Sequence, residues 1–273
     1  ALPWEAPEAV FWVGEGSSLH AAALSEAVLA AESGWVYTPK LSIVTPSSDF
    51  ETRAGRLSGP RNWFIGFSHR GRTAVTAQAL SRAREKGFFT AWIASKDIPE
   101  FPPGAHLGVG AGPLEKVEPH TSALSGAMVA ATIMLGTSRI HHLWNDQASA
   151  WSEGIFNPPA EVLEWLQGGV GWVVGHGAAG WLARELALKC LELGGPLLHP
   201  CASEAFFHGP ALFLPERNEP VRVLHLTCGT DPRGDEWQGG YRPPGAQIAN
   251  WNLWDAGSGQ NLVRALMSVQ RAA

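Results

Sequence analysis

Short apolar runs alternate with longer segments of helix-forming residues in the first half of the chain. The run Ala9–Val13 (AVFWV) predicts a buried strand, and the Ala-rich segment Leu19–Ala31 predicts the helix after it. The alternation continues and predicts strands at Leu41–Val44, Trp63–Phe67, Phe88–Ala94 and His106–Ala111, and helices at Ala74–Lys86 and Thr121–Leu135. Strands separated by helices of this length predict a parallel sheet covered on both faces.

A polar, turn-rich segment, residues 136–159, interrupts this pattern and is interpreted as a linker or crossing segment. The alternation then restarts and predicts helices at Pro159–Gln167, after Gly175-His176-Gly177 and at Gln260–Gln270, and strands at Val170–Val174, Ala211–Leu214, Val221–Thr227 and Ile248–Leu253. Both halves repeat an apolar strand, Gly-x-Gly and an Ala/Leu-rich helix, which indicates an internal duplication. We therefore predict an α/β fold in two domains, residues 1–145 and 146–273.

The composition of the chain argues against nucleic acids and membranes as binding partners. Charged residues make up 16% of the chain, the net charge is -5, and no run of Lys or Arg could form a patch for nucleic acid or a membrane surface. No apolar stretch has the roughly 18 residues of a membrane span, and no signal-peptide pattern is present. Cys190, Cys201 and Cys228 are too few and too irregularly spaced for a disulfide framework or a CxxC metal site. We expect a cytoplasmic protein with reduced thiols that binds neither nucleic acid nor a membrane.

The segment Arg184–Pro210 concentrates titratable side chains. In a helix, Glu185, Lys189 and Glu192 stand at i, i+4 and i+7, so two carboxylates and an amine share one face. His208 follows on a loop constrained by glycine and proline. The simpler interpretation is a surface helix with an i,i+4 ion pair, worth a few tenths of a kcal/mol. Spacing alone leaves both interpretations open.

Two loops that precede predicted helices are candidate anion sites. Gly175–Gly180 fits the G-x-G-x-x-G dinucleotide pattern, but no acidic residue closes a following strand as ribose recognition requires. Ser68–Thr73 (SHRGRT) brings hydroxyls, a glycine and two arginines to a helix N-terminus, where free N–H groups and the helix dipole suit a phosphate. A capped helix start with solvated arginines is the alternative. We favour phosphate at Ser68–Thr73 and keep nicotinamide binding as a minor alternative.

Four motifs occur in the order seen in double sugar-isomerase-domain (SIS) proteins. They are GEGSS at Gly14–Ser18, FSHRGRT at Phe67–Thr73, the stretch Glu185–Pro210 and GQNLVRAL near the C-terminus. The chain is most similar to the isomerase half of the glucosamine-6-phosphate synthase family (glutamine–fructose-6-phosphate aminotransferase). That half carries a helix like ELALKCLE, followed at the same interval by His-Gly-Pro. The resemblance covers nearly the whole chain and implies two three-layer αβα sandwiches with parallel sheets.

The resemblance implies a role for each matched residue. Glu192 matches the base that moves a proton between C1 and C2, and Lys189 matches a group that assists at the sugar. His208 matches the ring-opening histidine, which a neighbouring subunit supplies in that family, so a homodimer with shared sites is implied. The catalytic candidates are Glu192, Lys189, His208 and Glu185, and the phosphosugar-binding candidates are Ser17, Ser18, Ser68, His69, Arg70, Thr73, His120 and Arg264.

The residue types suit that chemistry without a metal or cofactor. An aldose–ketose shift needs a base near neutral pKa, which a carboxylate reaches by partial burial, and a second group for the ring-oxygen proton. Glu192 on an apolar helix and His208 supply both types. The acidic residues of Cys228–Gln247 match no metal-binding loop, and the other histidines lack metal-ligand spacing. We expect no cofactor and no metal site.

The chain departs from the family at two important places. The family loop S-Q-S-G-E-T is replaced by one that contains His69, Arg70 and Arg72, so phosphate binding would be rebuilt around arginine. The C-terminal catalytic lysine aligns with Arg264, which stays protonated and cannot form a Schiff base. We expect an aldose–ketose isomerase or deaminating isomerase acting on a hexose or hexosamine 6-phosphate, without glutaminase activity. A non-catalytic phosphosugar-binding sensor is the alternative.

Overall fold

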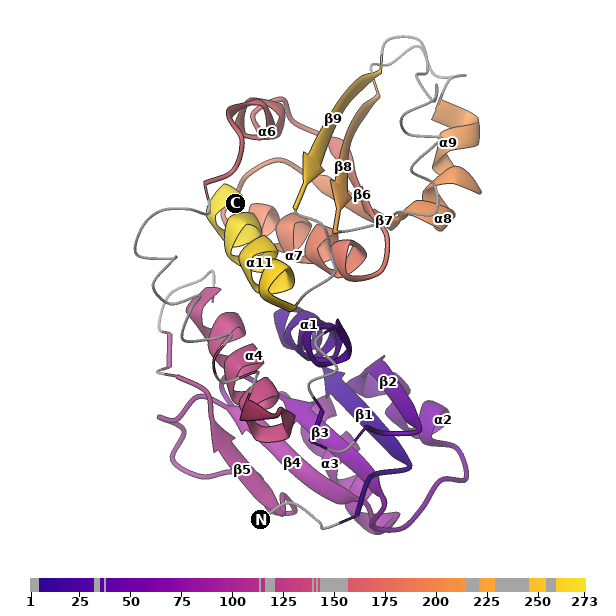
Figure 1. Ribbon diagram of the computed structural model, residues 1–273, viewed down its shortest axis with the longest axis vertical. Coiled ribbons are helices and arrows are strands. Elements are labelled where there is room, and N and C mark those ends of the chain that lie inside the picture. The colour runs from indigo at the N-terminus through magenta and orange to yellow at the C-terminus, as the bar shows by residue number, and fades with distance from the viewer. Residues whose placement is uncertain are drawn as a thin grey trace. The chain divides into compact units, whose positions relative to one another are not determined.

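The computed structural model describes residues 5–31, 35–36, 38–112, 114–115, 121–138, 140, 142, 157–214, 221–228, 246–253 and 259–273. For residues 121, 122, 259–264 and 267 it describes the backbone alone. The chain divides into two compact units, Ala1–Trp144 and Asn145–Ala273 (Figure 1). Each unit contains one parallel sheet, which confirms the predicted α/β class.

The first unit contains a five-stranded parallel sheet in the order β2-β1-β3-β4-β5. Its strands are β1 (Ala9–Gly14), β2 (Leu41–Pro46), β3 (Asn62–Phe67), β4 (Phe89–Ala94) and β5 (Leu107–Gly110), and its helices are α1 (Ser17–Ala31), α2 (Phe50–Ala54), α3 (Ala74–Glu85) and α4 (Thr121–Leu135), with the 3₁₀ turn η1 (Ser47–Asp49) after β2. The strand order reverses between β1 and β3. In open α/β sheets, ligands bind at the carboxyl ends of the strands beside such a reversal.

Helices cover both faces of this sheet. Helices α1 and α4 pack together over one face, and α2 and α3 lie over the other (Figure 1). On the α2–α3 side, the ring of Phe50 makes edge-to-face contacts with Phe11, Phe64 and Phe88 at centroid distances of 5.4, 5.0 and 6.0 Å. Because both faces are covered, every residue of β1, β3 and β4 is buried, which explains why these strands are almost entirely apolar.

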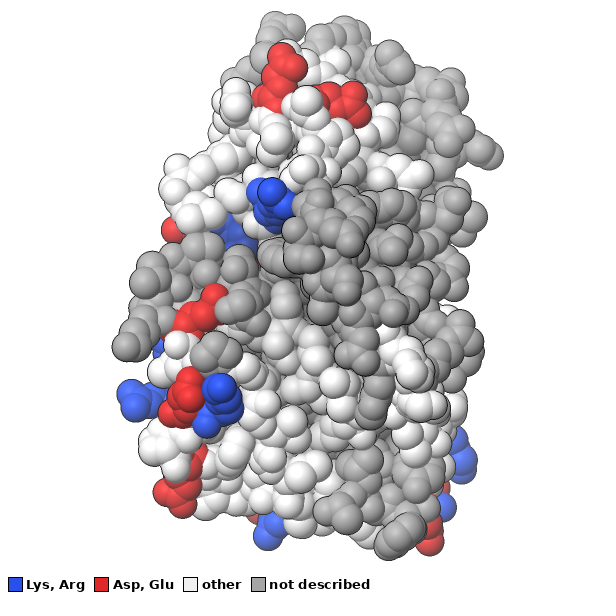
Figure 2. Space-filling view, turned by 60° about the vertical axis from the view of Figure 1, so that its left-hand side comes forward, with Lys and Arg blue, Asp and Glu red and all other residues white. Residues whose placement is uncertain are grey.

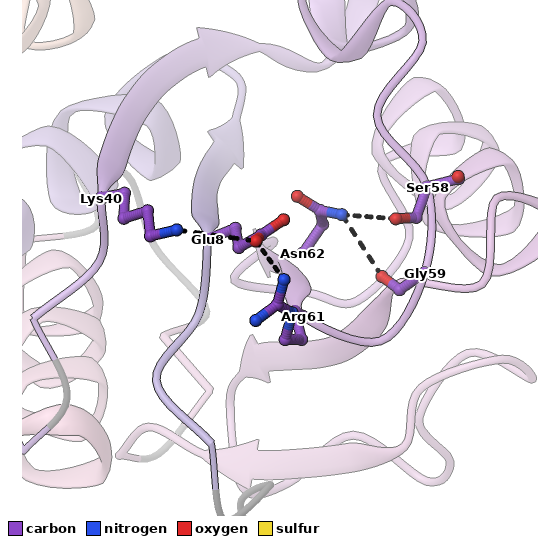
Figure 3. A network of polar contacts seen from close by, with 6 residues as sticks. All are labelled: Glu8, Lys40, Ser58, Gly59, Arg61 and Asn62. Carbon is purple, nitrogen blue, oxygen red and sulfur yellow. Dashed lines mark hydrogen bonds and ion pairs between the residues drawn. The ribbon is translucent and has the colours of Figure 1, made fainter.

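Charged side chains join the amino ends of the first three strands (Figure 3). Glu8, just before β1, pairs with Lys40, just before β2, at 3.7 Å, and with Arg61, just before β3. Beside them, the side-chain amide of Asn62 donates to two carbonyls of the preceding loop. The ion-pair partners are exposed, so each pair contributes at most about 1 kcal/mol. This network lies at the amino edge of the sheet, whereas the loops after β1 and β3 lie at its carboxyl edge.

The second unit contains a four-stranded parallel sheet in the order β7-β6-β8-β9. Its strands are β6 (Gly171–Gly175), β7 (Leu198–Ala202), β8 (Arg222–Thr227) and β9 (Gln247–Asn252), and its helices are α6 (Ala160–Leu166), α7 (Ala178–Glu192), α8 (Ser203–Phe207), α9 (Pro210–Phe213) and α11 (Gly259–Ala272). Helix α7 packs on β6 and β7 and against α11 (Figure 1). On the opposite face, Phe206 of α8 and Ala211 of α9 form a core with Val174 and Val223.

Arg222, a buried residue at the start of β8, closes the end of α6. Its guanidinium donates to the carbonyls of Trp165, Gly169 and Val170. It also lies 4.5 Å from the centre of the Trp165 ring and donates to the side chain of Gln247 at 3.3 Å. Burial lowers the pKa of Arg222 from its ordinary value, yet an arginine remains protonated at neutral pH. The last carbonyls of a helix are a favourable place for such a cation.

We expect Arg222→Met to reduce the free energy of unfolding by about 2–4 kcal/mol, because several carbonyls would lose their donor and the methionine would not refill the volume. Arg222→Lys keeps the charge and loses the planar fork of donors, so its effect is expected to be intermediate. Urea titration of the three proteins measures these differences. Unchanged stability of Arg222→Met would contradict the structural role.

The segments β1–α1 and β6–α7 share one backbone geometry. A Cβ atom on Gly14 or Gly175, which end the two strands, would come within 2.8 or 2.6 Å of the backbone of the following helix. Gly16 and Gly177 have φ angles of +51° and +54°, which are strained for other residues. In both units, therefore, Gly-x-Gly allows a helix to start directly against the end of its strand. This shared geometry supports the internal duplication.

One predicted strand is wrong. Residues Ala211–Leu214 lie largely in helix α9, which begins with Pro210 at a position where its missing N–H is not needed. Four apolar residues have no periodicity that separates a buried strand from a helix. Strand β7 was not predicted because it contains Pro200. This proline is tolerated because β7 is an edge strand that pairs only with β6.

Three short segments, η1, α2 and α8, were also not predicted. The remaining predicted strands and helices are observed, with boundaries that differ by about one or two residues. Within the described ranges, no helix combines the length and apolar character of a membrane span. On the face drawn in Figure 2, the described basic and acidic side chains are scattered in small groups of both signs.

Candidate functional site

The loop after β1 presents two hydroxyls at the start of α1. Ser17 and Ser18 are the first residues of this helix and follow Gly16, whose positive φ angle turns the chain into it. The Oγ atom of Ser17 is buried and has no hydrogen-bond partner among the described residues. Buried hydroxyls are normally paired, and helix N-termini attract anions. This loop therefore has the features of an anion-binding element.

The loop after β3 brings Ser68 and Thr73 together. Oγ of Ser68 lies 3.0 Å from Oγ1 of Thr73, and the N–H of Thr73 donates to the same serine oxygen at 3.4 Å. Thr73 is the N-cap residue of α3, yet its side chain makes no capping hydrogen bond to the helix. In many helices a side-chain oxygen at this position accepts the first backbone N–H groups. Here the Thr73 side chain does not, so these N–H groups could bind an anion.

His69 links this loop to the start of α4. Its Nε2 accepts the N–H of Glu115 at 3.2 Å, and the Glu115 carboxylate accepts the N–H of Ala123 at 2.7 Å. The side chain of Arg70 is exposed beside it. Two other candidates cannot be located, because His120 lies outside the described residues and only the backbone of Arg264, in α11, is described.

In the second unit, α7 places Glu185, Lys189 and Glu192 together, as their spacing predicts. Nζ of Lys189 lies 2.8 Å from Oε2 of Glu192 and 3.8 Å from Oε1 of Glu185. The side chains of Glu185 and Lys189 are 0% and 1% exposed, whereas that of Glu192 is 26% exposed. The interpretation as a plain surface pair is therefore wrong. A buried ammonium is held between two carboxylates, and one of these reaches solvent.

His208 lies elsewhere in the second unit. It follows α8, and its Nε2 lies 3.5 Å from Oε2 of Glu204, with both side chains well exposed. Helix α8 packs on the face of the sheet opposite to α7. Within this unit, then, the histidine is separated from the three ionisable residues of α7.

Solved structures with the same architecture include several sugar-phosphate enzymes. A protein from Silicibacter pomeroyi, provisionally described as a phosphosugar isomerase, matches with a TM-score of 0.72 and 16% identity over 97% of this chain and 85% of that chain. Glucosamine-6-phosphate deaminase from Thermotoga maritima matches with a TM-score of 0.64 and 18% identity over 98% and 86%. The C-terminal domain of glucosamine-fructose-6-phosphate aminotransferase from Francisella tularensis matches with a TM-score of 0.64 and 15% identity over 97% and 83%.

The chain has the double SIS fold. This confirms the fold implied by the four sequence motifs, at identities that establish architecture alone. No protein-family model matches the sequence, and no curated protein is significantly similar to it. A function for this chain must therefore be argued from its own residues and not from its fold.

In this SIS fold, packing accounts for the glycines of the dinucleotide-like pattern. Gly175 and Gly177 serve the close start of α7, and a Cβ on Gly180 would lie 3.1 Å from the carbonyl oxygen of Gly175. Glu204 does follow β7, an acidic residue overlooked because that strand was not predicted. Its carboxylate pairs with His208. The pattern thus has a structural explanation that needs no nucleotide.

The carboxyl edge of the first sheet also holds Glu15, Ser47 and Thr76, which were not among the residues predicted from the sequence. Oε1 of Glu15 accepts the N–H of Ser47 at 2.8 Å, and Oγ of Ser47 lies 2.8 Å from Oγ1 of Thr76. The signal that could have found Glu15 and Ser47 is their position two and three residues after predicted strands, because ligands bind at the carboxyl ends of strands in open α/β sheets.

Burial and hydrogen bonds within the fold account for the side chains of His106 and the cysteines. Burial, with a smaller contribution from Arg84, lowers the pKa of His106, whose Nδ1 accepts the N–H of Thr90. All three cysteines are free thiols, and burial raises the pKa of Cys190 to about 11 and that of Cys228 to about 12. Within the described ranges, no group of three or more His, Cys, Asp or Glu side chains is arranged to hold a metal ion.

Proposed function

We propose that the protein is a phosphosugar isomerase that interconverts the aldose and ketose forms of a hexose or hexosamine 6-phosphate. The observation that carries this proposal is the Glu185–Lys189–Glu192 cluster. A buried ammonium fixes one oxygen of Glu192 in place, and the partly exposed carboxylate can still meet a ligand. A fixed carboxylate of this kind suits a general base.

In the proposed reaction, Glu192 removes the C2 proton of the open-chain aldose, and the bond electrons form the C1–C2 double bond of an enediol. Return of a proton to C1 gives the ketose, while O2 loses its proton and O1 gains one. For a hexosamine 6-phosphate, the same transfer gives an imine at C2, and water then releases ammonia. Lys189, whose buried ammonium contacts Glu192, would assist the transfer by keeping this carboxylate in place.

Binding of the phosphosugar is assigned to the hydroxyl-bearing loops of the first unit. The unpaired hydroxyl of Ser17, the Ser68–Thr73 pair and the starts of α1 and α3 support an anionic ligand. Arg70 adds positive charge at the surface of the same loop. His69 contributes by holding the loop to Glu115, so its direct contact with the sugar stays a prediction.

NMR of fructose 6-phosphate and glucosamine 6-phosphate in heavy water tests the proposal. The expected result is enzyme-dependent incorporation of deuterium at C1 or C2. A panel that also contains other hexose 6-phosphates identifies the preferred sugar. Absence of exchange with every member would overturn the isomerase assignment.

We further propose a homodimer in which His208 acts in the partner's site. Its exposure, and its separation from the α7 cluster within one unit, support this arrangement. Mixing Glu192→Gln and His208→Ala subunits should then restore about a quarter of wild-type activity, because half of the mixed dimers' sites would be intact. Activity no greater than that of the separate variants would contradict shared sites. Analytical ultracentrifugation measures the dimer directly.

A sensor without turnover is the second candidate function. The use of His69 as a structural link, in place of a residue typical of the family's phosphate loop, favours it. A sensor would be stabilised against heat by sugar phosphates without any solvent exchange. Turnover that depends on Glu192 would dismiss this candidate. The cytoplasmic location remains a prediction in either case.

A further inference from the structure

A chain of hydrogen bonds connects the two loops of the proposed phosphosugar site. It starts at Glu15, which lies between Gly14 and Gly16 in the β1–α1 loop. Its Oε1 accepts the N–H of Ser47, the first residue after β2, at 2.8 Å. Oγ of Ser47 then meets Oγ1 of Thr76, in the first turn of α3, at 2.8 Å. The chain therefore runs from the start of α1 to the start of α3 by way of the end of β2.

Burial makes this connection rigid. Ser47 and Thr76 are 4% and 0% exposed, so neither hydroxyl can replace its partner with bulk water. The bond from Glu15 has a charged acceptor, which makes it stronger than a bond between neutral groups. An unpaired buried hydroxyl is costly, so the pair holds one geometry.

The elements joined in this way carry the groups assigned to binding. Glu15 lies two residues before Ser17, and Thr76 lies one turn after Thr73, the N-cap residue of α3, which contacts Ser68. Helices α1 and α3 lie on opposite faces of the sheet, and the paired strands β1 and β3 that precede them form the regular connection between them. The side chains of Glu15, Ser47 and Thr76 add a second connection, at the level of the loops themselves.

We propose that Glu15, Ser47 and Thr76 are positioning residues that set the spacing between the two anion-binding loops. This inference rests on the proposed phosphosugar function and adds the residues that pre-organise its site. Each acts through Ser17, Ser68 or Thr73 and touches no ligand itself. Pre-organisation raises affinity by removing the cost of ordering the loops on binding.

A double-mutant cycle on Ser47 and Thr76 separates positioning from stability. Ser47→Ala and Thr76→Val each leave one buried hydroxyl unpaired and should lower the melting temperature. The double variant leaves neither unpaired, so its melting temperature should return close to that of the wild type. Thr76→Ser keeps the hydroxyl and serves as the conservative control.

Affinity for fructose 6-phosphate and inorganic phosphate, measured by calorimetry on the full chain, provides the deciding readout. We expect the double variant to bind both about tenfold more weakly than the wild type in spite of its restored stability, with Thr76→Ser close to the wild type. Where turnover is measured, KM should rise by a similar factor while kcat changes little. Recovery of both stability and affinity in the double variant would overturn the inference, because the pair would then be structural only.

Glu15 gives an independent test of the other end of the chain. Glu15→Gln keeps an oxygen that can accept the N–H of Ser47, so it should retain most of the affinity for fructose 6-phosphate and phosphate. Glu15→Ala has no such oxygen, and its affinity should fall about as much as that of the Ser47/Thr76 double variant. Equal affinity of Glu15→Ala and the wild type would also overturn the inference. If the wild type itself binds no phosphosugar and no phosphate, the proposed function fails and the inference fails with it. Binding that is insensitive to every variant leaves the function standing and removes the inference alone.

Discussion

Glu192→Gln is expected to slow hydrogen exchange at C1 and C2 of a bound sugar phosphate by about 10²–10⁴-fold, because the amide cannot accept the proton. The amide keeps the size of the carboxylate and an oxygen for Lys189 Nζ, which lies 2.8 Å away in the wild type. Affinity for the sugar phosphate should therefore change little. NMR exchange rates and calorimetric dissociation constants, measured on the same preparation, distinguish a lost base from a lost site.

Glu164→Gln is a matched control for this change. Glu164 is an exposed carboxylate on α6, another helix of the second unit, and no catalytic role is assigned to it. It should exchange hydrogen at the wild-type rate. A Glu192→Gln protein that retains full exchange would exclude Glu192 as the base and would favour the sensor function.

Lys189→Met is expected to reduce the free energy of unfolding by about 3–5 kcal/mol, because breaking a buried ion pair leaves a buried charge without compensation. Glu185 is 0% exposed and would lose the ammonium that lies 3.8 Å from its carboxylate. Glu192, at 26% exposure, can turn to water and would lose less. Guanidinium titration at neutral pH measures the difference, and turnover should fall as well.

The double variant Glu185→Leu/Lys189→Met removes both members of the buried pair. Replacing a buried ion pair by apolar residues of similar volume is often neutral or stabilising, so most of the lost stability should return. Turnover should not return, because Glu192 would still lack its ammonium. If Lys189→Met were as stable as the wild type, the burial of the cluster would be in doubt. If the double variant recovered turnover, Lys189 would have no part in the chemistry.

Much of the fold could be predicted because its signals are local. The apolar run at Ala9–Val13 and the Ala-rich segment after it identify a buried strand and a helix without any tertiary information, and Gly14 and Gly16 mark the turn between them. Where the pattern conflicted with tertiary context, the prediction failed. Pro200 argues against a central strand, and only the position of β7 at the sheet edge makes it acceptable.

The ionisable cluster on α7 was predictable as a set but not in its environment. Helical periodicity places Glu185, Lys189 and Glu192 on one face, yet it cannot tell whether that face is covered. Burial of Lys189 at 1% exposure depends on how neighbouring elements pack, which no local pattern encodes. The cluster is, for this reason, a stronger candidate in the structure than in the sequence.

The hydrogen-bond chain through Ser47 was not predictable for a similar reason. Its members are separated by 32 and 29 residues and meet only because parallel strands bring their carboxyl ends to one edge. The role of His69 follows the same rule, since its partner Glu115 lies 46 residues away. Residue types were enough to identify Ser68–Thr73 as a candidate anion-binding loop. Which of its side chains contact other parts of the protein could be learned only from the tertiary structure.

The two Gly-x-Gly turns show that both units use the same strand–turn–helix backbone, but the side chains at the start of the helix differ. The first copy places Ser17 and Ser18 at the start of its helix, and the second places Ala178 and Ala179 there, which have no side-chain oxygen to offer. The second helix instead concentrates its ionisable groups near its other end. After a duplication, one half can keep its backbone and lose its ligand-binding side chains while it gains catalytic ones. Gene duplication followed by such specialisation would give one chain two complementary halves from a single ancestral plan.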